Sequence, residues 1–310
     1  MPNCTRYAAC KKYEGCPWFW GVPGLCGEHA GCPRFIYTAI DMKRLTLPLS
    51  FCLFFCGLAA DAQPRKKRIL AIGQVKGFQH DATTNGMATM WKLGKESGLW
   101  DTYIRTDTQL ITKKKLTGNA KNIDYFDAVF FYTTGELELD DEQKSALLSF
   151  VHDDGKGFIG AHSAIDTLYK WPEYGEMVGG YFDGHPWNQF QAPIVVEDPD
   201  HPATRHFPKT FIAFDEIYQA KAFSRDKVRV LLSMDADQLD LKNKNVKRTD
   251  RDFAIAWVKN YGKGRVFYST FGHRDEMWDR ADIQKMWLEA AKWTMGMTEG
   301  DATPRPKPSK

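Results

Sequence analysis

The sequence predicts an α/β fold: a doubly wound, mainly parallel sheet with antiparallel β additions in the second half of the chain. In the first half, short apolar runs alternate with segments of helical periodicity, which is typical of β-α-β units. After Trp187, successive apolar runs are joined by turns and polar loops, which indicates antiparallel strands. Hydrophobic residues make up 43% of the chain, enough for a sizeable core.

The parallel half is expected to contain four strands, each a short apolar run. They are residues 69–72, 99–106, 128–132 and 157–161. A helix is expected over residues 82–98, because apolar side chains recur there at helical spacing and Gly98 ends the pattern. Asp140 and Gln143 form the sequence pattern of a capping box, which predicts the start of the next helix. The polar connection 108–122 is expected to lie on the surface and to include a short helix.

The second half is expected to add five more strands and a closing helix. The strands are residues 191–196, 211–218, 228–234, 253–258 and 265–269, of which the last two form a hairpin. Residues 283–295 show amphipathic periodicity and are followed by Gly296, so a helix is predicted there. The domain is expected to cover residues 63–298. A tail rich in proline and lysine, residues 299–310, is expected to be disordered.

The N-terminal region contains the three parts of a secretory signal. Met42-Lys43-Arg44 precedes an apolar run and the small-x-small pattern Ala60-Asp61-Ala62. The run is shorter than the about 20 residues of a membrane-spanning helix, so no stable membrane anchor is expected. Cleavage near Ala62 would produce a soluble secreted or periplasmic protein. Residues 1–41 precede this signal and are expected to be a spurious or disordered extension.

Cysteine placement and charge exclude several classes of function. All seven cysteines precede residue 57, so the domain is not expected to use a thiol or a disulfide. The spacing of the first five matches no paired C-x-x-C zinc motif. The net charge of +3 and the scattered basic residues argue against a nucleic-acid partner.

Three histidines follow predicted strands. They are His80, His162 and His273, and Asp215-Glu216 lies near the end of another strand. Loops at the carboxyl ends of a doubly wound sheet can converge on one crevice. Three neutral imidazoles and the Glu216 carboxylate form a ligand set for a divalent transition metal such as zinc. The same groups could act without a metal, with His162 or His273 as general base and Glu216 as acid. Each histidine could instead cap a helix or bond a backbone group.

Ser163, beside His162, suggests a serine hydrolase as a weaker alternative. The local run from Gly160 to Ala164 lacks the G-x-S-x-G pattern of a nucleophile elbow. Aromatic side chains are plentiful after this run, and aromatic faces can pack against the C–H surfaces of sugars. The residues expected to bind a substrate are Asp183, His185, Trp187, Tyr218 and Trp278. For His185, which precedes a proline, a structural role in the loop is an equal alternative.

An ordered series of short motifs resembles the trehalose-utilisation, or ThuA-like, family. The motifs are His162-Ser-Ala, Trp171-Pro172, Gly179-Gly180-x-Phe182-x-x-His185-Pro186, His201-Pro202, Asp215-Glu216-x-Tyr218, Ala256-Trp257, Gly262-Lys-Gly-Arg-Val266 and Gly272-His273. The resemblance covers about residues 68–296. It implies a fold similar to class I glutamine amidotransferases, in agreement with the doubly wound, flavodoxin-like prediction. Those enzymes carry a cysteine nucleophile at the turn that matches His162-Ser163 here, so amidotransferase chemistry is excluded.

The resemblance also implies a carbohydrate ligand, because the family is associated with disaccharide use and with enzymes that make 3-keto sugars. The expected function is an exported enzyme that acts on a keto-sugar or glycoside, with no nucleotide cofactor. A non-catalytic sugar-binding protein is the alternative from another class. A homo-oligomer is compatible with the sequence.

Overall fold

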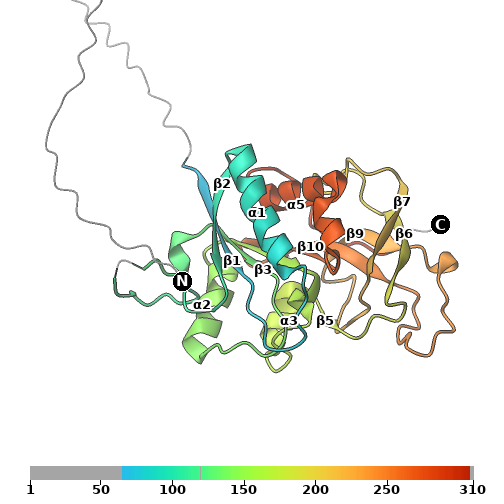
Figure 1. The fold of residues 1–310 in the computed structure, drawn as a ribbon, viewed down its shortest axis with the longest axis horizontal. Coiled ribbons are helices and arrows are strands. Elements are labelled where there is room, and N and C mark those ends of the chain that lie inside the picture. Colours follow the sequence, from blue (N-terminus) through green and yellow to red (C-terminus); the bar gives the residue numbers. More distant parts are fainter. Residues whose placement is uncertain (1–64, 119, 308–310) are drawn as a thin grey trace, which may run out of the picture. The chain divides into compact units, whose positions relative to one another are not determined.

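A nine-stranded sheet forms the centre of the protein in this computed structural model, which describes residues 65–118 and 120–307. The strand order is β2-β1-β3-β4-β11-β10-β9-β6-β7. The predicted signal and the extension before it lie outside the described residues. The predicted α/β class, with a mainly parallel half and antiparallel additions, is confirmed (Figure 1).

Five neighbouring strands of the sheet run parallel. They are β2 (Trp100–Arg105), β1 (Lys67–Ile72), β3 (Ala128–Phe131), β4 (Gly157–Ala161) and β11 (Gly264–Ser269). Most of β1 and all of β3 and β4 are buried, as expected of parallel strands that are covered on both faces.

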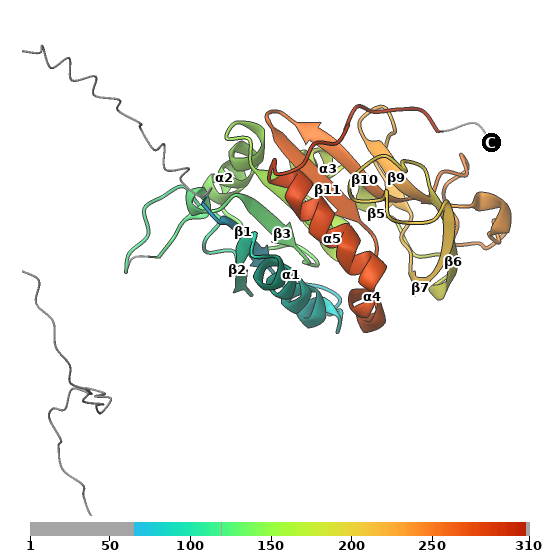
Figure 2. The same cartoon turned by 90° about the horizontal axis from the view of Figure 1, so that it is seen from above.

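The other four strands of the sheet extend it in antiparallel fashion. They are β10 (Ala254–Tyr261), β9 (Arg229–Met234), β6 (Gln189–Val196) and β7 (Thr210–Glu216). Figure 2 shows β6 and β7 at the end of the sheet far from β2. A separate two-stranded sheet pairs β5 (Tyr181–Phe182) with β8 (Ala220–Lys221), and these short strands were not predicted.

Helices cover both faces of the parallel half (Figures 1 and 2). On one face lie α1 (Thr83–Ser97), α4 (Asp275–Asp279) and α5 (Ala281–Thr294), and on the other lie α2 (Asp141–His152) and α3 (Pro172–Val178). Alternate residues of β3 therefore enter different cores: Phe130 packs with the α1–α5 side, and Val129 and Phe131 with the α2–α3 side. Short 3-10 helices occupy Ile123–Tyr125, His162–Ile165 and Ala236–Gln238.

Local sequence signals explain where several of these helices begin and end. Asp140 caps α2, and Gln143 returns a hydrogen bond to the Asp140 backbone, so the predicted capping box is present. Gly98 ends α1 in the left-handed conformation, with φ of 71°. The short helix expected within residues 108–122 is absent from the described part of that segment. Instead, Thr112 and the backbone of Lys113 bond to Glu142, which holds the connection against α2 in an irregular conformation.

Strand directions place four loop connections at one edge of the sheet. β1, β4 and β11 are parallel, so their carboxyl ends share this edge. From β11, the antiparallel pairings through β10, β9 and β6 return β7 to the same direction. The residues that follow these four strands are therefore brought to one side of the molecule.

Residues 299–307 pack on the domain, which corrects the prediction of a disordered tail for this segment. Trp293 Nε1 donates to Gly300 O at 2.9 Å, and Arg229 forms an ion pair with Asp301 at 2.7 Å. Ala302 is buried, and Arg305 donates to the backbone carbonyl of Glu197. A composition rich in proline and lysine does not reveal these contacts, because the domain supplies the partners.

Removal of residues 299–310 is therefore expected to destabilise the domain. The deletion removes the burial of Ala302 and leaves the Trp293 indole N–H without its acceptor, at a combined cost of about 2 kcal/mol. Urea unfolding of a chain that ends at Thr298 measures this loss. A chain that ends at Lys307 retains every contact described above and is the matched control. Equal stability of the two truncated chains would contradict the packing role of the tail.

No helix in the described residues is long and apolar enough to span a membrane.

Candidate metal centre

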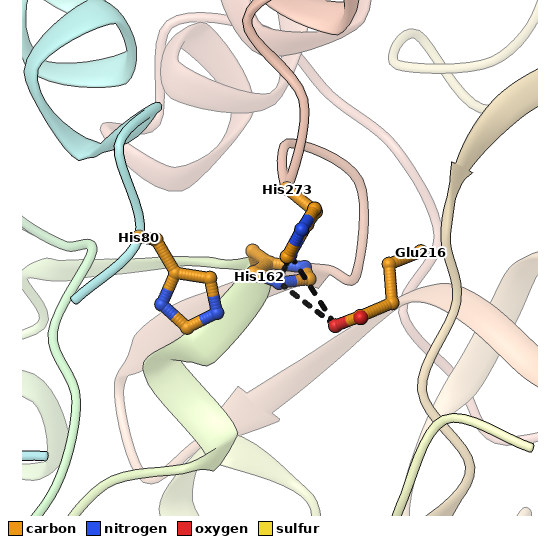
Figure 3. Close-up of side chains that lie close together, drawn as sticks. All are labelled: His80, His162, Glu216 and His273. Carbon is orange, nitrogen blue, oxygen red and sulfur yellow. Dashed lines mark hydrogen bonds and ion pairs between the residues drawn. The ribbon is translucent and has the colours of Figure 1, made fainter. Parts of the chain in front are cut away.

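Four side chains converge at the carboxyl edge of the sheet. His80 comes from the loop between β1 and α1, His162 directly follows β4, His273 follows β11, and Glu216 is the last residue of β7. One ligand atom from each of the four lies within 4.8 Å of the others. Figure 3 shows the three imidazoles and the carboxylate turned toward a common point. The structure thus brings together the four residues that the sequence singled out as metal ligands.

His162 occupies the sharp turn at the end of the central strand β4. Its φ of +43° lies in the left-handed region, which is costly for a residue with a side chain and is concentrated at functional sites. The side chain is completely buried. Nδ1 donates a hydrogen bond of 2.7 Å to Thr270 O, so in the neutral ring Nε2 presents its lone pair. This is the second-sphere contact that commonly orients a metal-binding histidine.

The distances among the donor atoms of His162, Glu216 and His273 are close to those of a tetrahedral site, and His80 completes the set within 4.8 Å. His273 Nδ1 lies 3.3 Å from Glu216 Oε1 and 3.3 Å from His162 Nε2. His162 Nε2 lies 3.9 Å from Glu216 Oε1. Ligand atoms about 2.1 Å from a zinc ion at tetrahedral angles are about 3.4 Å apart. The four donors could therefore hold one ion after small side-chain movements.

Hydrogen bonds accepted by Asp215 hold the end of β7 close to the loop after β11, although three strands separate β7 from β11 in the sheet. The backbone N–H groups of Gly272 and Arg274 donate to the two carboxylate oxygens of Asp215, at 2.7 and 3.1 Å. These donors flank His273 on both sides. Asp215 therefore fixes the position of His273 next to Glu216.

Tyr218 connects two of the histidines. Its hydroxyl forms a hydrogen bond of 3.1 Å with His80 Nε2, and its ring centroid lies 4.2 Å from that of His162. Thr134 Oγ1 lies 3.4 Å from His80 Nδ1. Tyr218 is buried, so its side chain packs against the histidines and has almost no surface exposed for the predicted contact with a substrate.

Burial keeps two of the imidazoles neutral, which metal binding requires. Desolvation, followed by the nearby His273, lowers the pKa of His80 to about 4. Desolvation also lowers the pKa of His162 well below its usual value, and His80 adds to this effect. For His273, desolvation opposes the charged form, but the hydrogen bond and the charge of Glu216 outweigh it and the pKa is raised. An acidic partner thus faces the one imidazole that favours a positive charge.

The predicted substrate-binding residues have different positions. His185 is partly exposed, and its Nδ1 lies 3.5 Å from Glu216 Oε2, so it borders the cluster. Asp183 forms an ion pair of 2.8 Å with Lys247. Trp187 packs on Phe253 and borders a separate cavity, outside the cluster.

The prediction that Trp278 binds the substrate is corrected by the structure, because a ligand cannot contact this side chain. Its side chain is completely buried and stacks on Trp287 at 5.2 Å. Its indole Nε1 donates to Gly272 O at 3.0 Å. Trp278 therefore supports the loop that carries His273 and belongs to the core.

Ser163 is poorly placed to act as a nucleophile. The left-handed elbow conformation belongs to His162, whereas Ser163 is completely buried in the following 3-10 helix. Its Oγ has no hydrogen-bond partner among the described residues, so no base activates it.

A fluorophosphonate probe is accordingly expected to leave Ser163 unlabelled. Intact-mass spectrometry after incubation with the probe measures the label, and chymotrypsin treated in parallel shows that the probe is active. A Ser163→Ala variant is expected to retain the metal content of the wild-type protein. Covalent labelling that disappears in this variant would restore the serine hydrolase alternative.

A cavity of about 290 Å³ adjoins the cluster, with His80 and His273 in its wall. Its other lining residues were not identified from the sequence. They are Phe78, Gln79, Asp81, Ala82, Gln189, Arg274, Asp275 and Glu276. All of them except Gln189 lie within three residues of His80 or His273 in the chain, so their position near two candidate ligands was the signal available in the sequence.

Fold and site together define an α/β protein of the glutamine amidotransferase-like class in which a histidine occupies the elbow. The profile of the ThuA family, described as trehalose utilisation, matches residues 68–294. The chain belongs to this family, which confirms the resemblance seen in the sequence.

Solved structures of two ThuA-like proteins are similar to this fold. One, from Bacteroides uniformis, has 23% sequence identity and a TM-score of 0.61, and the match covers 75% of this chain and 92% of that one. The other, from Parabacteroides merdae, has 17% identity and a TM-score of 0.58, and the match covers 77% of this chain and 97% of that one. A search of curated proteins gave no match.

Proposed function

We propose that this protein is a metal-dependent enzyme that acts on a keto-sugar or glycoside. His80, His162, Glu216 and His273 would hold a divalent transition ion such as zinc. The observation that carries the proposal is the convergence of four ligand atoms within 4.8 Å at the carboxyl edge of the sheet. Ligand sites of open α/β sheets lie at this edge.

The chemistry of the donor set supports a catalytic rather than a structural ion. Three histidines and one carboxylate suit zinc and related ions, whereas closed structural zinc sites are built largely from cysteine, which the domain lacks. His273 is partly exposed and lines the adjoining cavity, so the cluster is open on this side. A divalent ion held here would supply Lewis-acid polarisation of a sugar oxygen.

The residues of the chain have separate roles in this proposal. His162 is held by Thr270 O and directs its second nitrogen at the cluster. Glu216 presents Oε1 to His273 and Oε2 to His185, at 3.3 and 3.5 Å. His185 is the more exposed of these two imidazoles and lies at the solvent edge of the site. The carbohydrate substrate is supported by the description of the family as trehalose utilisation.

Elemental analysis of the purified protein, combined with a turnover assay, tests the proposal. About one equivalent of a transition metal is expected, together with conversion of 3-keto-glucosides that stops after chelation and resumes after zinc is restored. Absence of metal with unchanged turnover would leave metal-free acid–base chemistry by His162, His273 and Glu216. Tight sugar binding with neither metal nor product would instead identify a non-catalytic sugar-binding protein.

Export is the second part of the proposal, and the pattern from Met42 to Ala62 supports it. N-terminal sequencing of protein recovered from the periplasmic or secreted fraction is expected to begin at Gln63. A chain recovered only from the cytoplasm with residues 42–62 intact would contradict export.

A further inference from the structure

His80 is held differently from the other three residues of the cluster. His162 lies in the sharp turn directly after β4, and Glu216 is the last residue of β7. His273 is fixed by the hydrogen bonds of the loop after β11. His80 instead follows residues 76–79, an exposed part of the connection between β1 and α1. The sheet and its hydrogen bonds therefore fix three of the residues, whereas a surface loop carries the fourth.

The distances between donor atoms separate His80 from the other three residues in the same way. His273 Nδ1 lies 3.3 Å from His162 Nε2 and 3.3 Å from Glu216 Oε1, and the last two atoms are 3.9 Å apart. Within the part of the chain that the structure describes, His80 forms no ion pair with Glu216. His162, Glu216 and His273 thus form a compact set, and His80 lies at its margin, within the 4.8 Å that encloses all four donors.

Both ring nitrogens of His80 already face hydroxyl groups. Nδ1 lies 3.4 Å from Thr134 Oγ1, and Nε2 lies 3.1 Å from the Tyr218 hydroxyl. Tyr218 packs on His162, so Nε2 is the nitrogen on the side of the cluster, and Figure 3 shows one nitrogen of this ring turned that way. The Tyr218 hydroxyl is buried and has no other hydrogen-bond partner among the described residues, so it donates to Nε2.

This hydrogen bond uses the lone pair through which His80 would bind a metal ion. A neutral imidazole has one lone pair for either purpose, so the Tyr218 hydroxyl and the ion compete for Nε2. When Nε2 leaves the ion, Tyr218 satisfies it and Thr134 satisfies Nδ1. The ring therefore exchanges one favourable contact for another, and release leaves no buried nitrogen without a partner.

The coordination position of His80 is the one that faces the adjoining cavity. His80 lines this cavity of about 290 Å³, whereas His162 and Glu216 do not. Catalytic zinc sites use three protein ligands and keep one position for an exchangeable ligand. The compact set of His162, Glu216 and His273 supplies three such ligands, and the fourth position opens toward the cavity.

We propose that His80 is the exchangeable ligand of this centre. An oxygen donor that enters from the cavity takes its coordination position: the bond between the ion and Nε2 breaks, and a bond to the entering hydroxyl or carbonyl oxygen forms. Nε2 then accepts the hydrogen bond from the Tyr218 hydroxyl. The inference rests on the proposed function, because it assumes the metal ion, and it specifies which ligand yields to the substrate.

Competition with a chelator of known affinity tests the inference on zinc-loaded protein. Tyr218→Phe removes the competing hydroxyl and keeps the ring, so it is expected to bind zinc about fivefold more tightly than the wild-type protein. His80→Ala is expected to weaken zinc binding by less than about tenfold, against at least about 100-fold for His162→Ala. Tyr174→Phe is the matched control, because its buried hydroxyl also has a single acceptor, Ala164 O at 2.6 Å, outside the cluster. Its zinc affinity is expected to equal that of the wild-type protein.

Nitrogen-15 NMR of the zinc-loaded wild-type protein, labelled at histidine, measures the exchange without any variant. Acetohydroxamate, a chelating ligand with two oxygen donors, is the probe. Its addition is expected to move the His80 Nε2 resonance from the position of a metal-bound nitrogen to that of a hydrogen-bonded one. The His162 Nε2 resonance is expected to remain metal-bound. An unshifted His80 resonance at saturating acetohydroxamate, or release of His162 together with His80, would overturn the inference.

The affinity series distinguishes failure of this inference from failure of the proposed function. Weaker or unchanged zinc binding by Tyr218→Phe would show that the hydroxyl does not compete with the ion. A loss in His80→Ala as large as that in His162→Ala would show that His80 is a permanent ligand. Either result would overturn the inference while the zinc centre stands. A wild-type protein that binds no zinc would overturn the proposed metal centre and the inference together.

Discussion

A His162→Ala variant will bind zinc at least about 100-fold more weakly than the wild-type protein, since even the loss of an outer partner of a ligand costs 10–100-fold. His162 supplies the most buried donor of the cluster, and its other nitrogen is already committed to Thr270 O. Competition with a chelator of known affinity measures the change.

The backbone at residue 162 makes the choice of variants important. Alanine at φ of +43° retains the strain of the left-handed conformation, whereas asparagine tolerates it better. His162→Asn is therefore expected to fold at least as stably as His162→Ala and to lose zinc to a similar degree. Comparison of the two variants distinguishes a loss of zinc affinity caused by the missing imidazole from a loss caused by unfolding.

His152→Ala is the matched histidine control for this series. His152 lies at the exposed end of α2, beside Asp153 and outside the cluster. It is expected to keep the zinc affinity of the wild-type protein. Zinc binding that survives in both His162 variants would remove His162 from the ligand set and contradict the proposed centre.

Local periodicity was sufficient to predict the fold class and most elements of the sheet. Strand β4 coincides with the predicted run, residues 157–161, because Gly155 and Gly157 mark the start of its apolar residues. The short strands β5 and β8 were missed because two-residue strands carry no periodic pattern. Packing against neighbours, rather than local sequence, determines such short pairings.

The convergence of the three histidines could be predicted because parallel strands share one carboxyl edge. The approach of Glu216 depends on the order of β10, β9 and β6 and on hydrogen bonds from the loop after β11 to Asp215, which one sequence does not reveal. The sequence also could not predict which aromatic side chains are exposed. Trp278 and Phe78 are both aromatic and both adjoin candidate ligands, yet one is completely buried and the other 65% exposed.

The free energy of unfolding is expected to depend on pH through His201, because its imidazole is buried. It is buried at a distance from the cluster, and its Nδ1 accepts the N–H of Ala203 at 3.2 Å. Desolvation lowers its pKa to about 4. An unfolded chain has a histidine pKa of about 6.5, so between pH 6.5 and 4 the unfolded state binds the proton and the folded state does not.

The folded state loses stability as the pH falls from about 6.5 to about 4, by up to about 3 kcal/mol for this one group, and loses none above pH 6.5. A His201→Asn variant retains an acceptor for the turn but cannot take up the proton. Relative to the wild-type protein, it is expected to gain stability progressively over this range.

The difference in free energy of unfolding between the wild-type protein and the His201→Asn variant is the informative quantity, because other groups titrate in the same pH range. The lowered pKa of His80 acts in the same direction as that of His201, whereas burial raises the pKa of Asp215 to about 7 and favours folding at lower pH. These contributions are common to both proteins and cancel in the difference. Urea unfolding at pH 7.5, 5.5 and 4.5 measures this stability difference. The same difference is expected with zinc and without zinc. A difference independent of pH would show that His201 is protonated in the folded state or accessible to water.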